Sequence, residues 1–305
     1  MPINTLTFNT NITGELDKAV AQKSVTGFLE DNALRAKFVG AKTVIISELG
    51  LSGLGDYDRD TGFTKGAVTL TDTPHVLAMD RGRSFQLDRE DEDEAAVPGL
   101  AGKIMGEFVR TKVIPEMDAY VLSKAASYAV TKGQTVTGTP ETGIAGMIAD
   151  AMTKAHNAVG FDEELVALVD SAVWKAFQTT PELSRSVVIS DFKRGEITTK
   201  VSHYNGMALI PVVDSRMHTA FDFYDGAEGD EYAGGFAPME TAQRIGFVVM
   251  PKKAVSLVKK TDKVRTFAPD QNLAADAWKL DYRIYYDAFI RNSLAGGIYT
   301  YVYEK

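Results

Sequence analysis

Residues 80–120 read DRGRSFQLDREDEDEAAVPGLAGKIMGEFVRTKVIPEMDAY, and the pattern changes from strand to acidic run to helix. Residues 84–87 have β character, six acids lie within 88–94, and an apolar stripe of helical spacing continues to about Ser127. The acids and Pro98 favour a helix start, because both suit the unpaired N–H groups and positive dipole end of a first turn. Pro115 lacks an N–H and clashes with the preceding turn, so it should kink or interrupt this helix.

The segment before this helix predicts a long β-hairpin over residues 41–88. Residues 43–46 form a short β run and residues 67–71 alternate apolar with polar. The glycine-rich, acidic stretch 50–66 between them predicts a flexible tip. Because a two-stranded ribbon is marginal alone in water, the hairpin should lie on another surface. Residues 1–40 are polar and only moderately periodic, which indicates an N-terminal arm.

The remainder of the chain predicts a compact α/β section followed by returning strands. The apolar run 165–169 is typical of a strand buried on both faces. Asn205-Gly206 is the strongest short hairpin signal in the sequence. Alternation within 280–288 and again within 298–303 predicts a terminal β-hairpin with an aromatic face. The other expected elements are helices at 144–159 and 171–178, and strands at 198–204, 207–213, 247–250 and 254–258.

Composition and charge exclude several classes of function. The chain has 305 residues, no cysteine and a formal net charge of −8. The lack of cysteine excludes disulfides, thiolate metal sites and cysteine nucleophiles. The negative charge argues against nucleic-acid binding. In the basic run 252–265, valine and leucine lie between the basic residues, which is typical of a solvated strand face. No apolar run approaches the roughly 20 residues of a membrane span, and no signal-peptide pattern is visible, so we expect assembly in a cytoplasm without a membrane partner.

Motifs that would carry catalytic chemistry are weak in this sequence. The four histidines lie at no metal-ligand spacing, residues 88–94 lack the glycine-punctuated pattern of a calcium loop, and the glycines of 50–55 lead to no phosphate-loop lysine. The nucleophile elbow Gly-x-Ser-x-Gly is absent. Arg81-Gly82-Arg83 could bind a phosphate or carboxylate, but Asp80 and Asp88 beside it favour ion pairs between chains or segments. We therefore expect no catalytic, cofactor or metal site.

Three segments, taken with the order of the elements, resemble a known family. They are 80–88 (DRGRSFQLD), 106–120 (GEFVRTKVIPEMDAY) and 276–287 (DAWKLDYRIYYD). They are similar to the hairpin-to-helix junction, the spine helix and a late peripheral-domain strand of the Hong Kong 97-type capsid fold of tailed bacteriophages. The resemblance implies an α+β fold with an N-terminal arm, an extended loop, a spine helix, a peripheral domain with a sheet and an axial domain.

The resemblance also implies a domain map and a role. The map is an arm at 1–40, an extended loop at 41–88, a peripheral domain at 89–139 and 246–305, and an axial domain at 140–245. The role would be that of a major capsid protein of the virion, self-assembling into pentamers and hexamers that enclose double-stranded DNA without specific recognition. A portal and a separate scaffolding protein would be its partners, because no long helical scaffolding segment precedes the arm.

The residues expected at the subunit interface follow from the same resemblance and from the charges around the hairpin. They are Lys65, Val68, Leu70, Arg81, Arg83, Asp88, Glu90 and Asp91. The family's lysine–asparagine cross-link is not carried over, because no motif fixes a partner for Lys65. Two alternatives stay open: an encapsulin-like nanocompartment shell, which shares the fold, and an unrecognised α/β enzyme.

Overall fold

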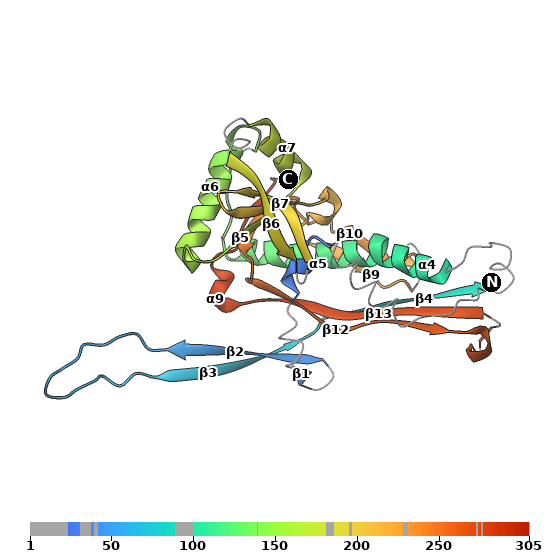
Figure 1. Cartoon of the computed structure of the whole chain (residues 1–305), viewed down its shortest axis with the longest axis horizontal. Coiled ribbons are helices and arrows are strands. Elements are labelled where there is room, and N and C mark those ends of the chain that lie inside the picture. The colour runs from blue at the N-terminus through green and yellow to red at the C-terminus, as the bar shows by residue number, and fades with distance from the viewer. Residues whose placement is uncertain are drawn as a thin grey trace.

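A computed structural model describes residues 24–30, 38–39, 42–88, 100–138, 140–180, 186–194, 197–227, 231–272, 274–275 and 277–304. Figure 1 shows three parts: a compact α/β unit, a long sheet with a helix lying along it, and a hairpin that projects beyond both. None of the described helices is long and apolar enough to cross a membrane.

The long helix of the molecule is built in three pieces. Helix α4 (Leu100–Phe108) leads into the π-helical turn η2 (Val109–Val113), and α5 (Ile114–Thr131) follows. The N–H of Ile114 bonds to the carbonyl of Val109, five residues back, immediately before Pro115. Proline offers no N–H to the carbonyls of the preceding turn, so the register change absorbs the defect. The predicted interruption at Pro115 is confirmed, and α5 buries Met117, Val121 and Leu122.

A three-stranded antiparallel sheet in the order β12-β13-β4 packs against this helix. Its strands are β12 (Val255–Phe267), β13 (Ala277–Ile290) and β4 (Met79–Asp88). Strand β4 was expected to belong to the hairpin, but it pairs with β13 along its whole length. The physical reason is burial: Phe85 and Leu87 pack against the main core, which a free ribbon does not provide.

The hairpin itself is shorter than predicted and covers residues 43–76. Strand β2 (Thr43–Leu51) pairs antiparallel with β3 (Val68–Val76), and the two-residue strand β1 (Phe38–Val39) pairs with the start of β2. Figure 1 shows the hairpin on the side of β12 and β13 that faces away from α5. The bounds of the predicted extended loop are therefore corrected at its C-terminal end.

The α/β unit contains a six-stranded sheet in the order β14-β11-β5-β8-β7-β6. Every residue of β5 is buried, as predicted for the apolar run, and β5 pairs in parallel with β8. Asp170 caps α7 by accepting the N–H of Val173 at 2.8 Å. The elements of this unit are α6 (Pro140–Val159), β5 (Leu165–Val169), α7 (Ser171–Thr179), β6 (Val187–Arg194), β7 (Ile197–Tyr204), β8 (Met207–Pro211), β11 (Ile245–Pro251) and β14 (Tyr299–Val302).

The predicted terminal hairpin is wrong. Strand β14 pairs with β11 in the six-stranded sheet, whereas β13 lies in the three-stranded sheet. The short helix α9 (Asn292–Ala295) redirects the chain between them. Strands β11 and β14 also place residues after 245 in the same sheet as β5, so the expected domain boundary at 245/246 does not follow a sheet boundary. Alternation of polarity identifies a strand but not its partner.

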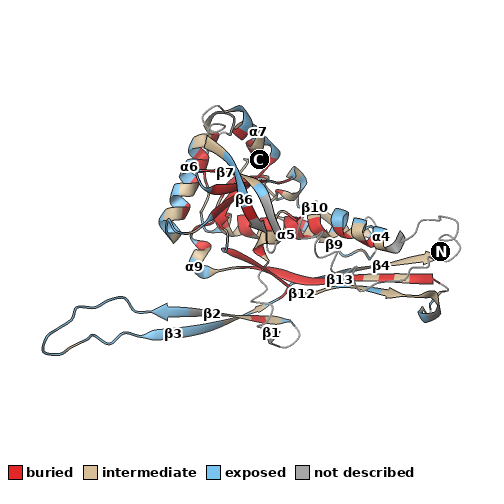
Figure 2. Cartoon of the chain, viewed as in Figure 1, coloured by how far each residue is buried: buried red, intermediate tan, exposed pale blue. Residues whose placement is uncertain are grey.

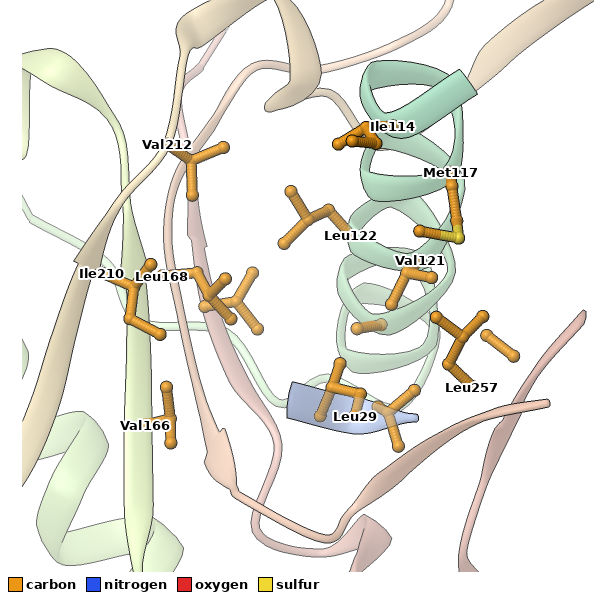
Figure 3. Packing of buried hydrophobic residues seen from close by; sticks show 14 of the residues in the cluster. Leu29, Ile114, Met117, Val121, Leu122, Val166, Leu168, Ile210, Val212 and Leu257 are labelled. Atoms are coloured by element: carbon orange, nitrogen blue, oxygen red, sulfur yellow. The ribbon is translucent and has the colours of Figure 1, made fainter. Parts of the chain in front are cut away.

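Smaller elements join these parts. They are η1 (Gly27–Leu29), η3 (Asp214–Arg216), the paired strands β9 (Phe221–Tyr224) and β10 (Gly235–Pro238), and η5 (Pro269–Gln271). Figure 3 shows how the main core forms where Leu29, α5 and the sheet residues Leu168 and Leu257 meet. A second core lies between α6, α7 and the other face of the six-stranded sheet.

The turn between β7 and β8 supports a direct test of the predicted hairpin. Asn205 and Gly206 both have positive φ, 47° and 84°. A two-residue hairpin turn that matches the right-handed twist of its strands requires positive φ at both positions. We expect Gly206→Ala to lower the free energy of unfolding by about 1–2 kcal/mol, because a side chain is strained at this φ. Urea unfolding measures the effect. The control Gly146→Ala lies in α6 where an added Cβ meets nothing within 4 Å, and it should stabilise instead.

Candidate subunit interface

The hairpin has two different faces, which the cross-strand register assigns. Leu49 lies opposite Leu70, and Leu51 lies opposite Val68. Directly opposite residues share a face, and alternate residues along a strand point to opposite faces. The four side chains therefore lie together on one face. Gly50, opposite Thr69, lies on the other face.

At its base the hairpin packs on its own chain. Val44 is fully buried in a small cluster with Leu77, Tyr285 and Phe289, and the ring of His75 lies 4.9 Å from that of Phe289. These residues cover the end of the three-stranded sheet that faces away from α5. The base is thereby fixed to the sheet by ordinary core packing.

Beyond this base the apolar face has no cover in the described part of the chain. Leu49, Leu51, Val68 and Leu70 are each between 62% and 70% exposed, and we call them the hairpin patch. Figure 2 shows this half of the hairpin as exposed along both strands. The sequence analysis found Val68 and Leu70 but missed their partners on β2. The alternation Leu49-Gly50-Leu51 was the available signal.

The tip of the hairpin is a compact turn with exposed aromatic rings. The rings of Tyr57 and Phe63 lie 4.9 Å apart, although both residues are exposed. Asp58 accepts the N–H groups of Thr61 and Asp60, and these two bonds lower the pKa of its carboxyl group. Lys65, one of the predicted interface residues, is exposed on the return from this turn.

The predicted interface residue Arg81 is engaged within its own chain. Its guanidinium group forms two bonds with the Glu116 carboxylate, at 2.6 and 3.2 Å, and donates to the carbonyl of Tyr224 at 2.8 Å. Arg83 donates to the carbonyl of Tyr232 at 2.9 Å. Both arginines thus connect β4 to α5 or to the region of β9 and β10, and the pair of Arg81 with Glu116 joins two segments of one chain.

The other predicted charges separate into two groups. Asp88 ends β4 opposite Ala277, whereas Glu90 and Asp91 lie outside the described residues. On the sheet face away from α5, Arg283 binds both oxygens of Asp80, at 2.9 and 2.7 Å. The hydrogen bond from Arg283 lowers the pKa of the Asp80 carboxyl group.

Sequence reasoning missed a buried acid that holds the N-terminal segment. Asp118 on α5 is fully buried and accepts the hydroxyls of Ser24 and Thr26, at 2.6 and 2.5 Å, and the backbone N–H groups of Val25 and Thr26. Arg216 completes the site with an ion pair at 2.9 Å. A carboxylate next to Met117 in an apolar helix stripe was the signal that could have revealed it.

A further group of ionisable residues lies at the end of β5. Arg244 contacts both Asp170 and Asp214, at 2.7 and 2.9 Å. The hydroxyl of Ser171 donates to Asp214 at 2.7 Å, so this serine is not paired with a base of the kind that activates a nucleophile. Among the described residues, no group of three or more potential ligands could hold a metal ion. The arrangement caps α7 and joins it to η3.

Comparison with known proteins gives no sequence match. No family model matches the chain, and no curated protein matches it. Solved structures do match. A structure from Mycobacterium phage Che8 has a TM-score of 0.57 at 11% identity, covering 91% of this chain and 90% of that chain. The capsid of cyanophage P-SCSP1u has a TM-score of 0.57 at 13% identity, covering 87% and 84%.

The chain has a phage capsid fold.

Two further solved structures match the chain. The mature capsid of bacteriophage PhiM1 has a TM-score of 0.54 at 12% identity, covering 90% of this chain and 83% of that chain. A virus-like particle from Pyrococcus furiosus has a TM-score of 0.53 at 9% identity, covering 96% and 98%. These coverages show that the likeness spans nearly the whole chain, and they confirm the capsid fold that the sequence predicted.

Proposed function

We propose that the chain is a major capsid protein, a structural subunit that self-assembles into the closed shell of a phage head. The observation that carries the proposal is the hairpin patch, four clustered apolar side chains on a ribbon that projects from the folded body. Contiguous exposed apolar surface of this kind marks a contact with another molecule. The capsid fold of the chain makes a second copy the simplest partner.

The energetics favour contact between identical subunits. Burying one leucine or valine side chain contributes about 1.5–3 kcal/mol, so a covered hairpin patch would contribute several kcal/mol to each contact. The patch lies on the projecting half of the hairpin, away from the folded body of its own copy. The hairpin of one copy would thus contact a different surface of the next copy. Contacts of this head-to-tail type generate closed rings, as in pentamers and hexamers.

The remaining partners belong to the same proposal. With a formal net charge of −8, the subunit would enclose double-stranded DNA by confinement, because strong phosphate binding requires concentrated positive charge. A portal and a separate scaffolding protein would complete the head, and assembly would take place in the host cytoplasm before the protein becomes part of the virion.

Electron microscopy of the purified full-length protein tests this proposal. We expect size-exclusion chromatography to show large assemblies and negative-stain images to show closed shells with five-fold and six-fold clusters. The measurement is repeated with a co-expressed scaffolding protein if the subunit alone stays small. A protein that remains monomeric under all of these conditions would contradict the proposal.

Two other functions make different predictions for the same sample. A nanocompartment shell, the alternative that the match to the Pyrococcus furiosus particle leaves open, would enclose a protein cargo and no nuclease-protected DNA. The contents of the purified shells therefore separate this alternative from a phage head. The enzyme alternative has less support, because the described ionisable cluster around Arg244 serves to cap a helix and includes no activated nucleophile.

A further inference from the structure

A cavity of about 370 Å³ opens between β4, the π-helical turn η2, β13 and the residues that connect β9 with β10. This volume lies within the range of small-ligand sites, about 300–1,000 Å³. Aromatic side chains form much of its wall: the ring of Phe108 lies 5.0 Å from that of Phe85 and 5.8 Å from that of Tyr282, in both cases edge to face. The wall thus offers an apolar surface to a ligand stem.

Tyr286 lines the same cavity and carries an unsatisfied polar group. The residue is 1% exposed, and its hydroxyl has no hydrogen-bond partner among the described residues. Burial, followed by the nearby negative charge of Glu116, raises the pKa of Tyr286 well above its ordinary value. The hydroxyl is therefore neutral at physiological pH and can donate a hydrogen bond. Buried hydroxyls normally have a partner, so the lack of one here is unusual.

The charges around the cavity leave positive groups available. Two acids pair with arginines, Glu116 with Arg81 and Asp80 with Arg283, whereas Asp225 accepts the N–H of Ala227 at 2.8 Å and keeps its negative charge. Lys112 is exposed and forms no ion pair with a described residue. An anion that enters the cavity would therefore meet cations whose charge is not already neutralised.

Arg83 is held in a defined position beside the cavity. Its Nη2 donates to the carbonyl of Tyr232 at 2.9 Å, and its guanidinium carbon lies 5.7 Å from the centre of the Tyr232 ring. Gly226 makes room for it, because a Cβ there would lie 2.8 Å from Nη1 of Arg83. Within the described chain its Nε and Nη1 groups have no acceptor. These two donors lie on different edges of the guanidinium group, and each can donate a charge-assisted hydrogen bond to a carboxylate oxygen.

We propose that this cavity binds a carboxylate carried on an apolar stem, with Arg83 and Lys112 holding the carboxylate and Phe85, Phe108 and Tyr282 contacting the stem. The carboxylate can come from a free organic acid or from a side chain of a peptide, and both present the same chemistry to these residues. The site is separate from the hairpin patch, so it does not depend on the proposed function.

Ligand-observed fluorine NMR tests the site with the full-length protein. The free-acid probe is 3-(4-fluorophenyl)propanoate, and the peptide probe is an acetylated, amidated tetrapeptide that contains 4-fluorophenylalanine followed by glutamate. We expect line broadening with at least one probe, and an affinity at least tenfold lower in Arg83→Gln combined with Lys112→Gln. The neutral alcohol 3-(4-fluorophenyl)propan-1-ol should bind at least tenfold more weakly than the acid.

Two variants separate ligand binding from structural effects. Lys175→Gln removes an exposed cation on α7, away from the cavity lining, and should leave binding unchanged. Tyr286→Phe should keep both the unfolding midpoint and the binding, because the hydroxyl has no described partner to lose and is closed off from the cavity. Equal binding to the Arg83/Lys112 double variant, equal binding of the alcohol, or no binding of either acid probe at millimolar concentration would overturn the proposal.

Discussion

Replacing Asp118 with asparagine is expected to lower the free energy of unfolding by about 3–5 kcal/mol, because it removes the fully buried carboxylate that pairs with the partly buried Arg216. Arg216 would be left with an uncompensated positive charge beside the main core. The hydroxyls of Ser24 and Thr26 would also compete for a neutral amide oxygen, which is a weaker acceptor than the carboxylate. This is the largest single-residue effect on stability that we expect.

Urea unfolding of the unassembled subunit, followed by tryptophan fluorescence, measures this loss. The matched control is Asp150→Asn, which removes an exposed acid on α6 that lies 4.0 Å from Lys154. An exposed pair of this kind contributes about 0–1 kcal/mol, so the control should be nearly neutral. Equal effects of the two substitutions would mean that the buried carboxylate does not hold the N-terminal segment.

Leu70→Asp is expected to reduce the yield of closed shells by more than about tenfold while the subunit stays folded. The substitution removes one side chain of the hairpin patch, worth about 1.5–3 kcal/mol when buried, and each 1.4 kcal/mol changes an association constant tenfold. It also places a charge opposite Leu49 on the contact face. The side chain is 67% exposed in the subunit, so little intrachain packing is lost.

The neighbouring residue provides the control for this experiment. Thr69→Asp adds the same charge one residue earlier, on the opposite face of the ribbon and across from Gly50, which has no side chain to repel it. Sucrose-gradient sedimentation and negative-stain counting should find shells at nearly the normal yield with Thr69→Asp. If the two variants assemble equally well, the hairpin patch is not a subunit contact and the proposed role of the hairpin fails.

Local features of the fold were predictable because they depend on neighbours in sequence. The uniformly apolar β5, the positive-φ turn at Asn205 and Gly206 and the interruption before Pro115 each follow from a few adjacent residues. The strand partners did not follow in this way. The residues of β14 alternate as a hairpin with β13 would require, yet they pair with β11 because the chain turns away at α9.

The candidate interface was predictable only in part, for a related physical reason. Val68 and Leu70 were found because alternation exposes one face of a strand, but their cross-strand neighbours on β2 required the register. Arg81 and Arg83 were recognised as charged contacts, but their partners within the chain could not be named, because Glu116 and Tyr232 lie far away in sequence. A sequence shows that a charged side chain needs a partner, but it does not show which distant residue becomes that partner in the folded chain.

The segment 24–30 has a consequence for the order of folding. It lies early in the chain, yet Phe28 packs on Phe192 of β6, and Glu30 pairs with Lys259 of β12. Its bonds to Asp118 join residues 92 to 94 positions apart. During synthesis these residues leave the ribosome long before β12 exists, so a segment that emerges before both sheets is among the last to dock. Contacts of such long range are slow to form, and the two sheets can fold separately before this segment joins them.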